Sequence, residues 1–344
     1  MMVTGKPHRI IFILTALFQC WQINAQDIHF SQFFASPQNL NPSLTGSFDG
    51  QYRMVINNRN QWQSFTNGYR TFSASSDCRI RPLIVPPAWS FGAGLLVNSD
   101  KAGDGNMGLT QLGISLATHH DITGTGKYII SAGICPSFFQ YSIDFSKLTF
   151  NSQYNGINYD SNILSNENFA GNSITFFDLS SGINLAALLS AKISLTMGFA
   201  ANHMLKPQIS FNNDPSVRLN PKYQYHALAM LSFRDDLIIY PSILFATQGK
   251  QKEFNWGGMV RIGLKNLYFQ SLYFGSWNRW NDAIILKTGT DYQNINIGIS
   301  YDINISKLTK ASNGRGGFEF SMAYIFNMKK EQKPLMYKHC PTFI

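Results

Sequence analysis

Hydrophobic and polar residues alternate one by one between Gly317 and Phe326. Large apolar side chains occupy every second position, and polar or small ones fill most positions between them, with Ile325 as the exception: Phe318, Phe320, Met322, Tyr324 and Phe326 alternate with Glu319, Ser321 and Ala323. A period of two predicts a β-strand with one apolar and one polar face. Such a strand suits a soluble sandwich, or an outer-membrane barrel whose apolar face meets lipid and whose polar face lines a lumen.

The same alternation recurs along the whole chain. It is clear at 112–117, 192–199, 254–265 and 295–304, and weaker near 51–58, 68–77, 89–98, 126–145, 173–185, 223–233, 236–247, 266–274 and 283–291. Each segment is close to the roughly 9–11 residues that a tilted membrane strand needs. The pattern predicts an all-β chain of about 14 antiparallel strands, and single-chain bacterial barrels favour even numbers of strands.

Composition favours the barrel over the sandwich. Charged residues make up 14% of the chain, aromatic residues another 14%, and the mean hydropathy is −0.11. A typical soluble domain carries about 25% charged residues. Outside the N-terminus there is no apolar run of about 18 residues, which excludes a helical membrane protein. The sequence therefore predicts a transmembrane outer-membrane β-barrel.

Individual positions extend this prediction. Charged residues on the polar faces are expected in a lumen: Lys192, Arg261, Lys265 and Asp302. Aromatic residues near strand ends are expected in the interfacial girdles of the barrel: Tyr69, Trp89, Tyr128, Tyr223, Tyr240, Trp256, Trp277 and Trp280.

Four regions follow from the pattern. Residues 1–25 have the charged start, short apolar stretch and small final residue of an export signal. Residues 26–50 form an N-terminal arm, periplasmic or plugging the barrel, because Pro37 and Pro42 argue against a continuous strand. The barrel is expected over 51–326, followed by a periplasmic tail over 327–344. The long loops near 146–172 and 305–316 are expected on the outside.

The net charge limits the classes of partner, and the number of cysteines limits the disulfides. The net charge is +9, and removal of Lys6 and Arg9 with the signal leaves 9 − 2 = +7. The basic residues are scattered, which favours contact with anionic lipid or an acidic partner over nucleic acid. Beyond the signal there are three cysteines, so at most one disulfide forms within the chain.

The chain lacks the short motifs of common enzymes. It contains neither an HExxH nor a GxSxG sequence, and no phosphate-binding GxxxxGK[ST] loop. No CxxC or Cys/His ligand spacing suggests a zinc site. We therefore predict no catalytic residues, no metal and no cofactor.

Several short motifs occur together and in order along the chain. They are 26–33 (QDIHFSQF), 40–47 (LNPSLTGS), 59–62 (RNQW), 316–319 (GGFE) and 340–343 (CPTF). Through these motifs, in their order and spacing, the chain resembles the PorP/SprF family of type IX secretion system outer-membrane proteins of the Bacteroidetes. It departs from the family pattern at Asn58, where Tyr is frequent, and at Thr342, where a basic residue is usual.

The resemblance implies an outer-membrane barrel of the secretion and gliding machinery of a Gram-negative bacterium. It would support secretion or surface attachment of an adhesin-type cargo protein with a C-terminal sorting domain, and a periplasmic peptidoglycan-binding subunit is a further implied partner. Partner-docking candidates are the motif residues Asn41, Pro42, Gly46, Arg59, Asn60, Gln61, Trp62, Cys340 and Pro341.

Structural roles are open for the same motif residues. Asn41, Pro42 and Gly46 could only shape a turn that plugs the barrel, while Arg59 and Trp62 could be a lumen ion-pair member and a girdle residue. Cys340 could pair with Cys78 or Cys135 or stay unpaired. The alternative function is an outer-membrane porin or a transporter of small hydrophobic molecules.

Overall fold

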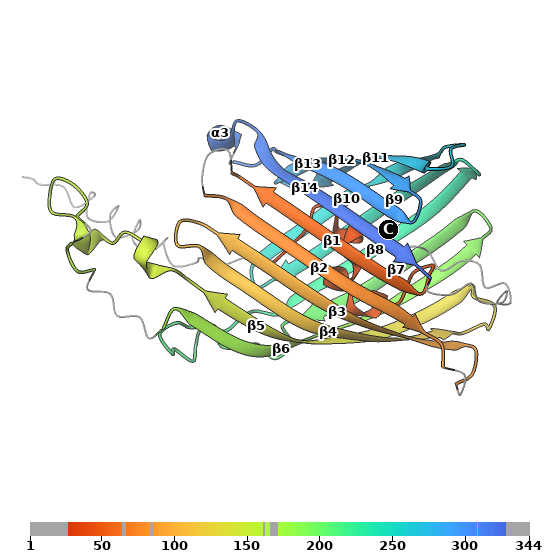
Figure 1. Ribbon diagram of the computed structural model, residues 1–344, viewed down its shortest axis with the longest axis horizontal. Helices are drawn as coiled ribbons and strands as arrows, with labels where there is room; N and C mark the ends of the chain where they lie inside the picture. Colours follow the sequence, from red (N-terminus) through yellow and green to blue (C-terminus); the bar gives the residue numbers. More distant parts are fainter. Residues whose placement is uncertain are drawn as a thin grey trace, which may run out of the picture.

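The chain folds into one closed antiparallel barrel (Figure 1). The computed structural model describes residues 27–63, 67–82, 85–160, 162–165, 171–307 and 309–327. The predicted signal, 1–25, and all of the predicted tail after residue 327 lie outside these residues. The described strands number fourteen and follow one another around the barrel in sequence order, with the first paired to the last. The predicted fold class and strand number are confirmed.

The strands match most of the alternating segments. They are β1 (Tyr52–Gln61), β2 (Tyr69–Ile80), β3 (Trp89–Ala102), β4 (Met107–Asp121), β5 (Tyr128–Ser142), β6 (Ser173–Ser190), β7 (Ile193–Asn202), β8 (Lys222–Arg234), β9 (Leu237–Gln248), β10 (Gln251–Gly263), β11 (Phe269–Arg279), β12 (Ala283–Tyr292), β13 (Ile295–Asn304) and β14 (Arg315–Phe326). The helical turns are η1 (Phe33–Ala35), α2 (Pro37–Leu40), η2 (Pro42–Leu44), η3 (Phe145–Lys147), η4 (Asn151–Gln153) and α3 (Thr309–Ser312). Among the described residues, no helix has the length and apolar character to cross a membrane.

The two faces of the strands differ as the alternation predicted. In β14, Glu319 and Ser321 are buried inside the barrel, whereas Phe318 and Tyr324 are exposed outside it. In β4, Ile114 is 53% exposed and its neighbour Ser115 is fully buried. The outside of the barrel is therefore apolar and the inside polar, which is the arrangement of a barrel surrounded by hydrocarbon.

The longest connections between strands lie at one end of the barrel. The antiparallel order places the connections at 143–172, 203–221 and 305–314 at one end, which we call the long-loop end. Two-residue turns at 191–192, 235–236 and 293–294 lie at the opposite, short-turn end. The β5–β6 connection projects well beyond the strands at the long-loop end (Figure 1). Long loops face the outside in outer-membrane barrels, so the two loops predicted to be external share one end.

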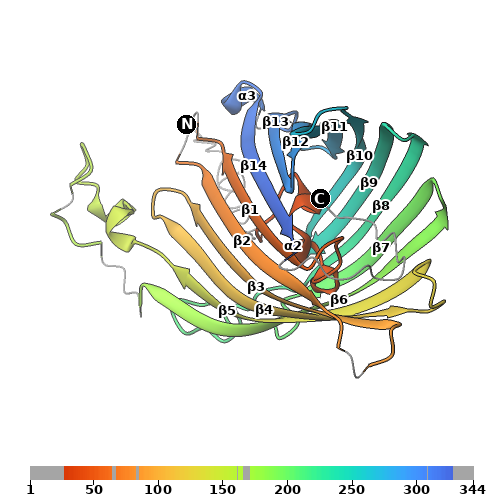
Figure 2. The same ribbon diagram turned by 45° about the vertical axis from the view of Figure 1, so that its right-hand side comes forward.

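The described residues 27–50 fill the lumen and are called the plug below. They start beside residues at the long-loop end and join β1 at the short-turn end. Figure 2 shows this segment, in red, within the ring of strands. Phe33, Phe34, Leu40 and Leu44 of the plug are buried in one cluster with wall side chains, including Trp277. The main hydrophobic core thus lies between plug and wall.

The position of the plug corrects two of the girdle predictions. Trp277 is 2% exposed because its ring lies 5.1 Å from that of Phe34, and its indole N–H donates to Ser242 Oγ at 2.8 Å. Tyr240 is buried in the same cluster. Both side chains point inward, so they belong to the core rather than to an interfacial girdle.

Two of the lumen predictions are also wrong. Lys192 lies in the exposed turn between β6 and β7, and Lys265 lies in the exposed β10–β11 connection. Each residue continues the alternation of the neighbouring strand in the sequence, but it lies beyond the end of that strand. Arg261 and Asp302 do point into the barrel, where Arg261 lies 3.7 Å from Asp291 and Asp302 is almost fully buried.

Candidate functional site

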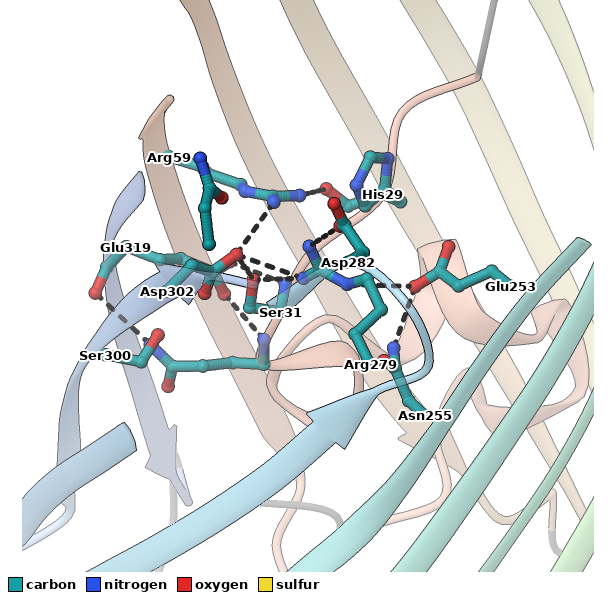
Figure 3. A network of polar contacts seen from close by, with 12 residues as sticks. His29, Ser31, Arg59, Glu253, Asn255, Arg279, Asp282, Ser300, Asp302 and Glu319 are labelled. Carbon is teal, nitrogen blue, oxygen red and sulfur yellow. Dashed lines mark hydrogen bonds and ion pairs between the residues drawn. The ribbon is translucent and has the colours of Figure 1, made fainter. Parts of the chain in front are cut away.

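The upper part of the plug binds to carboxylates of the barrel wall (Figure 3). Glu319 of β14 accepts hydrogen bonds from the backbone N–H groups of Ser31 at 2.7 Å and Gln32 at 2.9 Å. The Ser31 hydroxyl donates to Asp302 of β13 at 2.7 Å. Both carboxylates are almost fully buried. Charge-assisted bonds of this kind are stronger than neutral ones, so they fix the plug against β13 and β14.

Two arginines complete this network. Arg59 of β1 donates to the His29 carbonyl at 2.7 Å and to Asp302 at 3.0 Å. Arg279 of β11 donates to the Ser31 hydroxyl at 2.6 Å and to Asp302 at 3.1 Å. Asp302 therefore receives two buried guanidinium groups and one plug hydroxyl. Its removal would take from the buried Arg59 the ion-pair partner seen in the described residues, which is costly.

The middle of the plug lies directly against wall backbone. Asn41 caps η2 by accepting from the Ser43 N–H at 2.9 Å, and its amide donates to the Ile183 carbonyl at 3.0 Å. A Cβ on Gly182 would stand 2.0 Å from the Asn41 side-chain oxygen, and one on Gly133 only 2.5 Å from Pro42. Glycine is needed at these wall positions because the plug occupies the space of a side chain.

The lower plug is tied down by a second buried ion pair. Arg53 of β1 and Asp77 of β2 meet through two hydrogen bonds, of 3.0 and 2.7 Å, with both side chains 1% exposed. Asp77 also accepts from the Gly46 N–H at 2.7 Å, and Arg53 donates to the Leu44 carbonyl at 3.1 Å. Gly46 has φ +76°, and a Cβ there would lie 2.7 Å from the Gly92 Cα. The pair thus holds the turn in which the plug leaves the lumen.

The first described residue of the plug enters a third charged cluster. Asp27 lies 3.2 Å from His203 Nε2 and 3.3 Å from Lys222 Nζ, and His203 Nδ1 lies 2.6 Å from Asp178. Burial works against the charged forms, but Asp27 and Asp178 raise the pKa of His203 to about 9. Likewise Lys222 and His203 outweigh burial and lower the pKa of Asp27. At neutral pH His203 is therefore a cation that anchors the start of the plug.

This anchor predicts a loss of stability at alkaline pH. The folded pKa of His203, about 9, lies above the ordinary histidine value of 6.5. Its contribution to stability is therefore complete below pH 6.5 and is lost as pH rises through 9. This difference in pKa corresponds to about 3 kcal/mol of folding free energy. Asp27 stays ionised throughout this range, since its pKa is lowered. His203 has φ +57°, which Asn tolerates.

Thermal unfolding in detergent between pH 6 and 9.5 tests the anchor. The wild-type midpoint should fall across this range, and His203→Asn should start lower and show a much smaller fall. Parallel curves for the two proteins would contradict the anchor. Both proteins carry the same remaining titratable groups, so the difference between the curves isolates His203.

The structure separates the predicted docking residues into different places. Asn41, Pro42 and Gly46 belong to the plug, while Arg59 and Gln61 point inward from β1, and all five are buried. Asn60 is on the outer face and donates to the Asn58 side chain at 3.2 Å. Trp62 ends β1 at the mouth of the barrel with φ +62°. Cys340 and Pro341 lie outside the described residues.

Two further details concern cysteines and metals. Cys78 and Cys135 form no disulfide within the described residues, and Cys135 is buried inside the barrel. Within the described ranges, no group of three His, Cys, Asp or Glu side chains could hold a metal ion.

Sequence reasoning missed several residues that hold the plug. Arg53, Asp77, Arg279 and His203 were not singled out, although all four are nearly fully buried ion-pair members. The sequence did contain one signal for Arg53. It lies an even number of positions from Arg59 in β1, so both side chains are on the same face of the strand. The partners across the lumen had no signal in the sequence.

Above the plug, the long-loop end opens into a cavity of about 510 Å³, which we call the vestibule. The start of the plug forms its floor, and β1 to β5 supply most of its wall. Its lining includes Ile28, His29, Trp62, Tyr69, Asp100 and Tyr141. The barrel therefore has a plug inside its lumen and a recess above the plug at the long-loop end.

Comparison with known proteins gives one family and a set of similar barrels. The family model described as type IX secretion system membrane protein PorP/SprF matches residues 22–324. The comparison with curated proteins gave no match. Among solved structures, the toluene transporter TbuX of Ralstonia pickettii is 9% identical with a TM-score of 0.52, covering 84% of this chain and 92% of TbuX. The monoaromatic hydrocarbon channel CymD is 8% identical with a TM-score of 0.50, covering 85% of this chain and 93% of CymD. At these identities the likeness is one of fold.

Proposed function

The chain belongs to the PorP/SprF family of type IX secretion system membrane proteins and is an outer-membrane β-barrel, and from this premise we propose that it supports secretion or surface attachment of a cargo protein by binding it. The cargo would be an adhesin-type protein with a C-terminal sorting domain. Secretion components and barrels of this kind are in general not enzymes, and we propose a purely binding role here.

The observation that carries this proposal is the filled lumen. The plug is held by buried ion pairs at three levels, around Asp27, Asp302 and Asp77. A barrel closed in this way is suited to present surfaces rather than to pass solutes. The interaction with cargo is therefore assigned to the loops and mouth of the long-loop end, which faces the outside.

The β5–β6 connection supplies the best surface for it. Its projecting part is ordered by its own hydrogen bonds, such as Gln153 Nε2 to the Ile163 carbonyl at 3.0 Å. Tyr154 and Tyr159 pair across a short bridge, and Ile157 between them is 88% exposed. An exposed tip rich in Tyr, Asn and Ser resembles the composition of antibody binding loops, in which Tyr supplies contact area and small polar residues adapt.

A test compares two variants in the native outer membrane. The tagged protein should co-purify with a secreted protein that carries a C-terminal sorting domain. Ile157→Asp should lower the yield of that protein several-fold. Leu267→Asp should not lower it, because Leu267 is equally exposed, at 90%, but lies at the short-turn end. Recovery of the barrel alone, together with steady ion conductance in planar bilayers, would instead favour a porin or a transporter of small hydrophobic molecules.

The proposal also includes a periplasmic partner, at the short-turn end of the barrel. β14 ends at Phe326 at the short-turn end, and the sequence beyond it is basic, with Lys329, Lys330, Lys333 and Lys338. We assign a peptidoglycan-binding periplasmic subunit to this end. A tail deletion after residue 327 should release that subunit and leave cargo binding intact.

A further inference from the structure

The vestibule has features that its role as an outer recess does not explain. Trp62 has left-handed backbone geometry, φ +62°, which is rare for a bulky residue and marks strain. Its indole N–H is buried and has no hydrogen-bond partner among the described residues. The ring of Trp62 meets that of Tyr69 edge to face at 5.4 Å. Backbone strain of this kind clusters at ligand sites, so Trp62 marks the vestibule as a candidate site.

The charge of the vestibule is not balanced. Asp100 of β3 accepts a hydrogen bond from Thr71 Oγ1 at 2.5 Å, but it has no ion-pair partner in the part of the chain that the structure describes. The other charged lining groups are engaged: Arg59 with Asp302, Asp27 with Lys222, and Asp282 with Arg279. One half-buried carboxylate is therefore available for a cation.

Neighbouring groups suit an organic cation rather than a bare metal ion. Tyr69, Tyr141 and Trp62 line the cavity around Asp100, and the aromatic faces of such residues attract ammonium and guanidinium groups. Met107 and Leu109 add apolar surface for a methylene stem. His29 brings no competing positive charge, because burial and the nearby Arg59 and Arg279 lower its pKa well below 6.5.

We propose that the vestibule binds an alkylammonium or guanidinium group, which pairs with Asp100 and stacks on Trp62, Tyr69 and Tyr141. Two sources could provide this chemistry, a Lys or Arg side chain of a polypeptide at the cell surface and a free polyamine. The volume of about 510 Å³ accommodates either. The inference concerns the vestibule and holds whether or not the loop tip at Ile157 binds cargo.

Calorimetric titration of the purified full-length protein in detergent tests the site. The probes are acetyl-Gly-Arg-Gly-amide, the same peptide with neutral citrulline in place of Arg, and spermidine. The Arg peptide should bind at least about tenfold more tightly than the citrulline peptide, since it alone carries the charge. Spermidine binding more tightly than the Arg peptide would identify polyamines as the source. Binding of the Arg peptide alone would identify polypeptides.

Variants locate the binding. Asp100→Asn should weaken binding of the Arg peptide about tenfold and abolish the preference over citrulline. Asp235→Asn is the matched control, because it removes an exposed carboxylate at the short-turn end. Tyr69→Ala, at an exposed rim position, should weaken binding without affecting the fold. Equal binding of the Arg and citrulline peptides, or an unchanged preference in Asp100→Asn with the barrel folded by circular dichroism, would overturn the proposal.

Discussion

Asp302→Asn is expected to make open-channel events far more frequent than in the wild-type barrel. Asp302 is the common acceptor of Arg59, Arg279 and the Ser31 hydroxyl of the plug. Neutralising it takes from the buried Arg59 the ion-pair partner that the described structure gives it, whereas Arg279 keeps Asp282. Breaking a buried ion pair costs about 3–5 kcal/mol. Since about 1.4 kcal/mol is a factor of ten, the displaced state of the plug should gain at least on the order of 100-fold in population.

Planar-bilayer recording of wild type and variants provides the measurement. Asp291→Asn is the matched control. Asp291 is also a lumen carboxylate, and it contacts the wall residues Arg261, Ser271, Tyr273 and Asn296 rather than the plug. It should leave conductance near the wild-type level. A milder variant, Ser31→Ala, removes only the plug hydroxyl and should open the channel less often. Equal conductance in all four proteins would contradict a plug held through Asp302.

The strands and their faces could be predicted because they depend on local sequence. A period of two defines a strand whatever it packs against, and alternation in 295–304 and 317–326 placed Asp302 and Glu319 inside. The low charge content, the many aromatic residues and the lack of a long apolar run then favoured the barrel over the sandwich. The family resemblance, drawn from short motifs, is confirmed by the match over residues 22–324.

Contacts across the lumen could not be predicted in the same way. Ser31 and Asp302 are 271 residues apart, and nothing local to either identifies the other. The same limit explains the wrong prediction for Trp277. The alternation places this residue near a strand end, and its contact with Phe34 of the plug, which puts it in the core, cannot be seen in the sequence. The predictions for Lys192 and Lys265 were wrong for a different reason. The alternation of residues in the sequence continues beyond the last hydrogen bond of the strand, so it does not show where the strand ends.

The family-type motifs coincide with the plug and its supports. The 40–47 motif contains η2 and the Gly46 turn, and the 59–62 motif contains Arg59, which holds the His29 carbonyl. Their burial gives these residues a clear structural task in closing the lumen. The loop tip at Ile157 and the carboxylate of Asp100 carry no such motif. Residues that vary with the bound partner would be expected at such surface positions.

Asp77→Asn should be the most destabilising single change at the lower end of the plug. It removes the charge that holds Arg53 through two hydrogen bonds, with both side chains 1% exposed, and weakens the bond from the Gly46 N–H. We expect a loss of about 3–5 kcal/mol in unfolding free energy. The measurement is denaturant unfolding in detergent. The loss should come from removing the carboxylate charge opposite Arg53, because the new amide keeps nearly the same volume.

Two further variants decide whether burial of the charge is the cause. Asp236→Asn breaks an exposed pair with Arg234, whose side chains are 69% and 56% exposed, and should cost at most about 1 kcal/mol. Replacing both buried partners, Arg53→Met with Asp77→Leu, should recover much of the stability lost in Asp77→Asn, because no charge is left unpaired. If the double variant is less stable than Asp77→Asn, the hydrogen bonds to Gly46 and Leu44 matter more than the charge, and the lower plug is held by its turn geometry instead.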